Sequence, residues 1–220
     1  MCGIVAAYGK ISSTEELLDI RNVLYESKIR GLHSSGFSWF DGDKINIKTY
    51  NEPIVSSINK FDLNSILFDG NKIAMIAHIR YCTSDINYMQ PLGDENISIV
   101  HNGVVTQAPP EEWKDLFGVE CETKNDSEIL LKSLEKEDFY KKFENSSVSM
   151  LVLIKGEIFP IRNGYRPLWK ASNDHLEIYG STQNILIRGL KGDFNIEKIS
   201  PVFGEELIIR TLKLRGYERN

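Results

Sequence analysis

The chain has 220 residues, of which 41% are hydrophobic and 26% charged, and its formal net charge is -5; these values are typical of a globular protein with one sizeable core. No segment concentrates the lysines and arginines that would neutralise a phosphate backbone, so we expect no nucleic-acid partner. No apolar run approaches the roughly 20 residues of a membrane-spanning helix, and the N-terminus does not have the pattern of a signal peptide. The three cysteines are too scattered for a disulfide framework or a zinc site, so we expect a cytoplasmic protein without a metal.

The first half of the chain combines strand patterns with one helical pattern. An apolar run predicts a strand at residues 4–8. Ser13 and Glu16 have capping-box spacing, and apolar residues follow at near-helical intervals until Gly31, which predicts a helix. Runs of β-branched and aromatic residues predict further strands at residues 36–40, 45–50, 72–80 and 97–102.

The second half begins with helical patterns and then becomes rich in strands. A short helix is predicted at residues 111–117, just after two prolines, and a longer one over residues 125–143. A meander of strands is predicted at residues 148–154, 156–162, 167–171, 176–180 and 206–214. We therefore expect an α+β fold with layered sheets and no clear domain boundary.

Cys2 is the first candidate for chemistry. Removal of Met1 would make it the terminal residue, and would place a thiol and a free α-amine on one residue, a nucleophile with its own base. The pKa of an α-amine is about 7.7–8 and that of a thiol about 8.5, so the amine can accept the thiol proton near neutral pH. The alternative is that Cys2 is only a small core residue of the first strand.

Other polar residues follow the ends of predicted strands, where a rigid scaffold can present them to a ligand. Arg80 ends one strand, Asn102 and Gly103 follow another, and Asp126 begins a predicted helix. Each has a structural explanation when taken singly: a surface ion pair for Arg80, a hairpin turn for the Asn-Gly pair, and an N-cap for Asp126.

Taken together, these segments resemble class II glutamine amidotransferases, which are N-terminal-nucleophile hydrolases. The resemblance runs from Cys2 to about Ile209, and its segments occur in the family's order: MCGIVAAYG, RGLHSSGFSWF, AHIRYCTSD, QPLGDENISIVHNGVV, ETKNDSEIL, RNGYRPLW and YGSTQNIL. The resemblance implies a four-layer αββα sandwich of two mainly antiparallel sheets, with Cys2 at the end of a central strand. It also implies that residues 1–220 form a single glutaminase domain, with no synthase domain on this chain.

The resemblance also implies a mechanism. The thiol of Cys2 attacks the side-chain amide of L-glutamine, and the Asn102 side-chain amide and the Gly103 backbone N–H form the oxyanion hole. Ammonia leaves first, and water then cleaves the γ-glutamyl thioester to give glutamate. Because the terminal amine is the base, His78 and His101 are expected to be structural.

Further residues are implied to hold the rest of the substrate. Arg80 resembles the arginine that binds the substrate carboxylate, and Asp126 resembles the acid that binds its ammonium. Thr83 and Gln90 occupy positions where the family lines or closes the glutamine pocket. No metal or organic cofactor is required.

The leading hypothesis is a glutaminase that supplies ammonia to a separate synthase subunit. Two alternatives stay open. The enzyme could hydrolyse another γ-glutamyl amide, because the same pocket could accept a modified amide nitrogen. The chain could instead be a catalytically silent module that binds glutamine or has a regulatory role.

Overall fold

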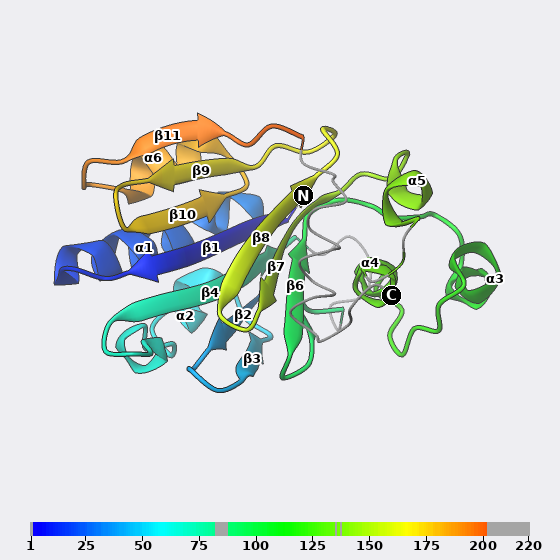
Figure 1. Ribbon diagram of the computed structural model, residues 1–220, viewed down its shortest axis with the longest axis horizontal. Helices are drawn as coiled ribbons and strands as arrows, with labels where there is room; N and C mark the ends of the chain where they lie inside the picture. The colour runs from blue at the N-terminus through cyan, green and yellow to red at the C-terminus, as the bar shows by residue number, and fades with distance from the viewer. Residues whose placement is uncertain (1, 82–87, 135, 137, 202–220) are drawn as a thin grey trace, which may run out of the picture.

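The computed structural model describes residues 2–81, 88–134, 136 and 138–201 (Figure 1). In this part of the chain the strands form two antiparallel sheets, one of seven strands and one of four. In spatial order, the larger sheet contains β11 (Asn195–Lys198), β9 (Trp169–Ser172), β10 (Leu176–Gly180), β1 (Gly3–Lys10), β4 (Lys72–Arg80), β2 (Ser34–Phe40) and β3 (Ile45–Tyr50). The smaller sheet contains β5 (Leu92–Gly93), β6 (Ile97–His101), β7 (Ser149–Ile154) and β8 (Glu157–Arg162). As expected, Cys2 directly precedes a central strand.

Helices cover the outer faces of the two sheets, and Figure 1 shows β7 and β8 crossing in front of the larger sheet. One helical group packs on the larger sheet and comprises α1 (Thr14–Glu26), α2 (Ile54–Ser57) and α6 (Gln183–Gly189). The other packs on the smaller sheet and comprises α3 (Trp113–Phe117), α4 (Ser127–Ser133) and α5 (Phe139–Phe143). A third core lies between the sheets, where Ile4 and Ile76 meet Leu151. The predicted four-layer αββα arrangement is therefore confirmed.

Ser13 is the N-cap of α1, as predicted, but its pairing with Glu16 forms only one of the two hydrogen bonds of a capping box, and the α-helix ends before the predicted position. The Ser13 hydroxyl accepts a hydrogen bond from the Glu16 backbone N–H at 3.3 Å. The Glu16 carboxylate accepts from the N–H of Ser12 at 2.7 Å, not from that of Ser13. The α-helix ends at Glu26, and the tighter 3₁₀ helix Ser27–Arg30 carries the chain on toward the larger sheet.

Two predictions for the second half of the chain are wrong, and two elements were not predicted. The single helix expected over residues 125–143 is two helices, α4 and α5, which allows Leu130 and Phe143 to enter the same core. The strands of the expected meander are divided between the sheets, because β8 belongs to the smaller sheet and β9 to the larger. The sequence reading also missed α6 and β11. The strand predicted at residues 206–214 lies outside the described residues.

Candidate active site

The register of the larger sheet brings Cys2 beside Arg80. β1 and β4 are antiparallel, and Gly3 pairs with Ile79. Extending that register by one pair places Cys2 opposite Arg80. The N-terminal end of β1 and the C-terminal end of β4 therefore lie side by side, along the edge of the sheet where these strands begin and end. A nucleophile and a cation at this edge can act on the same ligand.

A pocket of about 540 Å³ lies at this edge. Most of the site residues expected from the sequence line it, namely Cys2, Arg80, Gln90, Gly103 and Asp126. Asn102 lies between two lining residues, His101 and Gly103, and is 3% exposed. Thr83 lies outside the described residues. The fold thus gathers at one pocket residues that are widely separated in sequence.

Cys2 has an arginine neighbour that the sequence reading missed. The half-buried Cys2 has its Sγ 3.9 Å from the carbonyl oxygen of Tyr81. The Nε of Arg30 donates to the backbone carbonyl of Cys2 at 3.3 Å. Burial lowers the pKa of the Arg30 guanidinium, and the negative charge that Cys2 carries when its thiol is ionised opposes that shift. A Cβ at Gly31 would lie 2.3 Å from the backbone carbonyl of Arg80, so the chain after Arg30 passes close to the end of β4.

The Asn102–Gly103 segment is not the two-residue hairpin that its sequence would favour. Asn102 continues the pairing of β6, because its N–H donates to the carbonyl of Ser149 at 2.8 Å. A Cβ on Gly103 would lie 1.7 Å from the carbonyl oxygen of Ser147, so only glycine fits there. The side-chain nitrogen of Asn102 is buried and has no hydrogen-bond partner among the described residues. A buried donor without an acceptor is costly, and a bound ligand that supplies one would remove that cost.

Asp126 precedes α4, but its side chain does not cap the helix. Its carboxylate accepts instead from the backbone N–H of Val105 at 2.7 Å, just beyond the Asn102–Gly103 segment. Arg80, on the same pocket, is 7% exposed and donates through Nη1 to the carbonyl of Tyr88. The residues that line the pocket therefore include two cations, Arg80 and Lys124, and one carboxylate, Asp126, so groups of both charges face the same cavity, as a zwitterionic amino acid requires.

The side chains of Gln90 and His101 are both fixed by hydrogen bonds to other protein groups. The Gln90 side-chain oxygen accepts from the His101 backbone N–H at 2.6 Å, and its nitrogen lies 3.0 Å from the Ser127 hydroxyl. The His101 ring contacts Ser127 Oγ at 2.8 Å and the carbonyl of Ser147 at 3.0 Å. Burial lowers the pKa of His101, so its imidazole is neutral at pH 7. These contacts agree with a structural role for His101.

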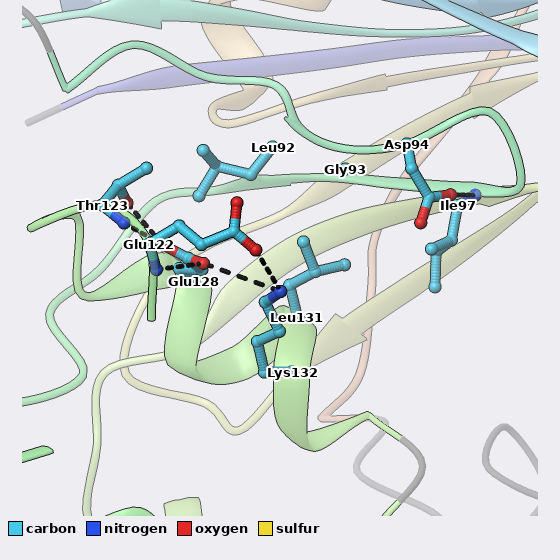
Figure 2. A pocket seen from close by; sticks show the side chains of 9 residues that line it. All are labelled: Leu92, Gly93, Asp94, Ile97, Glu122, Thr123, Glu128, Leu131 and Lys132. Carbon is cyan, nitrogen blue, oxygen red and sulfur yellow. Dashed lines mark hydrogen bonds and ion pairs between the residues drawn. The ribbon is translucent and has the colours of Figure 1, made fainter. Parts of the chain in front are cut away.

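The segment that leads to Asp126 is anchored from the side of a second pocket, of about 470 Å³ (Figure 2). The buried Glu128 carboxylate accepts from the backbone N–H groups of Glu122 and Thr123, at 2.9 and 2.7 Å, and from the Thr123 hydroxyl at 2.6 Å. Lys132 forms an ion pair with Glu122 at 3.0 Å. Within the described ranges, no group of three or more His, Cys, Asp or Glu residues is placed to hold a metal ion. The hydrogen bonds from Glu122 and Thr123 to Glu128 thus anchor the loop that leads to Asp126.

His78, on β4, is buried between the sheets, and its Nε2 has no partner within the described part of the chain. Burial, together with the charges of Arg80 and His101, lowers the pKa of His78 to about 3. An unfolded histidine titrates near pH 6.5, so below that pH the unfolded state binds a proton that the folded state does not. The free energy of unfolding should therefore fall as the pH falls.

The His78→Leu variant should reduce this pH dependence. Between about pH 6.5 and about pH 4.5, we expect the slope of unfolding free energy against pH to decrease by up to about 1.4 kcal/mol per pH unit. Urea unfolding at several pH values measures that slope. A slope equal to that of the wild type would show that His78 is protonated in the folded protein.

Comparison with known proteins identifies the fold. No model of a known protein family matches the chain, and no curated protein sequence matches it. Among solved structures, the glutamine phosphoribosylpyrophosphate amidotransferase of B. subtilis, in complex with ADP and GMP, is similar at a TM-score of 0.69 and 18% identity, over 91% of this chain and 46% of that one. A structure described as the allosteric regulatory enzyme of purine biosynthesis is similar at a TM-score of 0.65 and 18% identity, over 91% of this chain and 45% of that one.

The chain thus spans less than half the length of either neighbour. A shorter protein, described as a glutamine aminotransferase class-II domain protein from Silicibacter pomeroyi, matches at a TM-score of 0.49 and 14% identity, over 81% of this chain and 88% of that one. The first two comparisons show that the chain has the fold of the matched part of these structures, one of them a glutamine phosphoribosylpyrophosphate amidotransferase, in agreement with the fold that the sequence resemblance predicted. None of the helices in the described residues is both long and apolar enough to cross a membrane.

Proposed function

We propose that the chain is a glutaminase that hydrolyses the side-chain amide of L-glutamine. The observation that carries this proposal is the pocket itself, which the Cys2 thiol, the Arg80 cation and the Asp126 carboxylate all line. Beside it, the buried side-chain nitrogen of Asn102 has no hydrogen-bond partner among the described residues. In this proposal residues 1–220 form one glutaminase domain, and the ammonia is transferred to an acceptor on a separate synthase subunit.

The first half of the reaction forms a thioester. Removal of Met1 frees the α-amine of Cys2, which accepts the thiol proton. The sulfur then attacks the amide carbon, and the negative charge that develops on the carbonyl oxygen is held by the Asn102 side-chain NH₂ and the Gly103 backbone N–H. When the tetrahedral intermediate collapses, the amine returns the proton to the leaving nitrogen. Ammonia departs, and a γ-glutamyl thioester on Cys2 remains.

The second half consumes water. The α-amine removes a proton from the water that attacks the thioester, and the same oxyanion donors hold the second tetrahedral intermediate. Its collapse gives glutamate and regenerates the Cys2 thiol. The Arg30 hydrogen bond to the Cys2 carbonyl supports this geometry, because it fixes the backbone of the reacting residue.

The other end of the substrate carries one charge of each sign. Arg80 suits the α-carboxylate, because the planar guanidinium presents several donors to it. Asp126 suits the α-ammonium. The Val105 N–H bonds to one oxygen of that carboxylate and leaves the other for the ligand. Thr83 and Gln90 are proposed to line or close the same pocket.

The test is the turnover of L-glutamine by chain from which Met1 is absent, as shown by the mass of the intact protein. We expect glutamate and ammonia in equal amounts. When hydroxylamine is added, γ-glutamyl hydroxamate should form at the expense of glutamate, because hydroxylamine competes with water for the thioester.

Two outcomes contradict parts of this proposal. No product from a chain with a free N-terminal cysteine would overturn the glutaminase assignment. Glutamate and ammonia without any hydroxamate would retain the activity and overturn the covalent route.

A further inference from the structure

Ser127 lies where three segments of the proposed site meet. Its side chain is buried, with 2% of the residue exposed. Its Oγ is 2.8 Å from Nδ1 of His101 and 3.0 Å from Nε2 of Gln90. It also directly follows Asp126 in the chain. One hydroxyl group, at the start of α4, therefore connects two other segments. One contains His101, just before Asn102 and Gly103, and the other contains Gln90.

The direction of each hydrogen bond follows from the chemistry of its partners. A backbone carbonyl only accepts, so the contact at 3.0 Å from His101 to Ser147 places the ring proton on Nε2. His101 Nδ1 is then an acceptor, and the Ser127 hydroxyl donates to it. The Gln90 NH₂ group donates to Ser127, and the Gln90 oxygen accepts from the His101 N–H at 2.6 Å. These bonds close a ring in which the direction of every hydrogen bond is determined, and the Ser127 hydroxyl both accepts from Gln90 and donates to His101.

The ring joins the two ends of the proposed substrate site. On one side, His101 is followed by Asn102 and Gly103, the proposed oxyanion donors. On the other side, Ser127 follows Asp126, the proposed ammonium acceptor. The hydroxyl of Ser127 is thus a second link between the oxyanion donors and the Asp126 segment, beside the hydrogen bond from the Val105 N–H to the Asp126 carboxylate.

We propose that Ser127 is a positioning residue that couples recognition of the substrate ammonium at Asp126 to stabilisation of the oxyanion at Asn102 and Gly103. This inference rests on the proposed glutaminase function. A substrate that reaches both ends of the site gains from their fixed spacing. A substrate that lacks the ammonium uses only one end and gains little from the link.

The test compares L-glutamine with glutaramate, which has the same amide and carboxylate and lacks the α-ammonium. Ser127→Ala should lower kcat/KM for L-glutamine by about tenfold or more, the effect of losing a buried hydrogen bond. For glutaramate the loss should be several times smaller. The matched variant Ser127→Thr keeps the hydroxyl and should restore most of the preference for L-glutamine.

A second variant changes Gln90, another hydrogen-bond partner of Ser127, and leaves Ser127 itself unaltered. Gln90→Glu keeps an oxygen for the His101 N–H and removes the NH₂ that donates to Ser127. It should therefore produce the same selective loss on L-glutamine. Thermal unfolding of each variant establishes that the compared proteins are folded.

The outcomes separate this inference from the function on which it rests. Equal losses on both substrates, or no loss on either, in a folded variant of an active enzyme would overturn the coupling role and leave the glutaminase function intact. Absence of wild-type turnover on L-glutamine would overturn both. A selective loss on L-glutamine that the threonine variant restores would support the coupling role.

Discussion

Met1-free protein carrying Cys2→Ala is expected to release no measurable glutamate or ammonia from L-glutamine. Alanine keeps the α-amine and the fold of β1 but removes the atom that attacks the amide carbon, so no thioester can form. The loss should be about 10⁴-fold or more, as for other enzymes that lose their nucleophile. Product release under saturating L-glutamine measures it.

The chain supplies a matched control in Cys121→Ala. Burial, with a further effect from the charge of Glu128, raises the pKa of the Cys121 thiol to about 11, so it stays protonated and unreactive at neutral pH. We expect this variant to keep wild-type turnover. Activity that survives in Cys2→Ala would contradict the proposed mechanism.

Removal of the Asn102 side-chain amide is expected to have the next largest effect. Asn102→Ala should lower kcat by about 10²–10³-fold with little change in KM, because the lost hydrogen bond forms with the oxyanion and not with the resting substrate. The thermal stability should change little, since the deleted nitrogen has no partner among the described residues. Steady-state kinetics and thermal unfolding measure these two effects.

Asn102→Asp is a useful companion, because it keeps the size of the side chain and replaces both N–H donors with an acceptor. It should be at least as impaired as the alanine variant. If KM rises while kcat is unchanged in either variant, Asn102 contributes to substrate binding and not to transition-state stabilisation.

The sequence predicted the strands of this fold better than its helices. Nine strands were expected near their observed bounds, because each is a short run rich in β-branched, aromatic or small apolar residues: β1, β2, β3, β4, β6, β7, β8, β9 and β10. The break between α4 and α5 was missed, since the helical spacing of apolar residues continues from Ile129 to Phe143. The helix α4 nevertheless ends at Ser133, and no glycine or proline near that position indicates the end in the sequence.

The candidate site likewise has residues that the sequence predicted and contacts that it could not predict. Cys2, Arg80, Gly103 and Asp126 were expected from their types and order, and the structure places them on one pocket. The ring through Ser127 could not be predicted, because it depends on side-chain orientation in segments 11, 26 and 37 residues apart. Arg30 was missed for the same reason, since its contact with Cys2 spans 28 residues.

The central position of β1 bears on where a further domain can be added to this fold. Chain termini ordinarily fray, but here the strand that begins at Gly3 is paired on both sides, with β4 and with β10. Under the proposed function Cys2 needs a free α-amine, and any residue that stays attached ahead of it takes up that amine in a peptide bond. A gene fusion that keeps this proposed function and joins the fold to an ammonia-consuming enzyme would therefore add the new domain downstream.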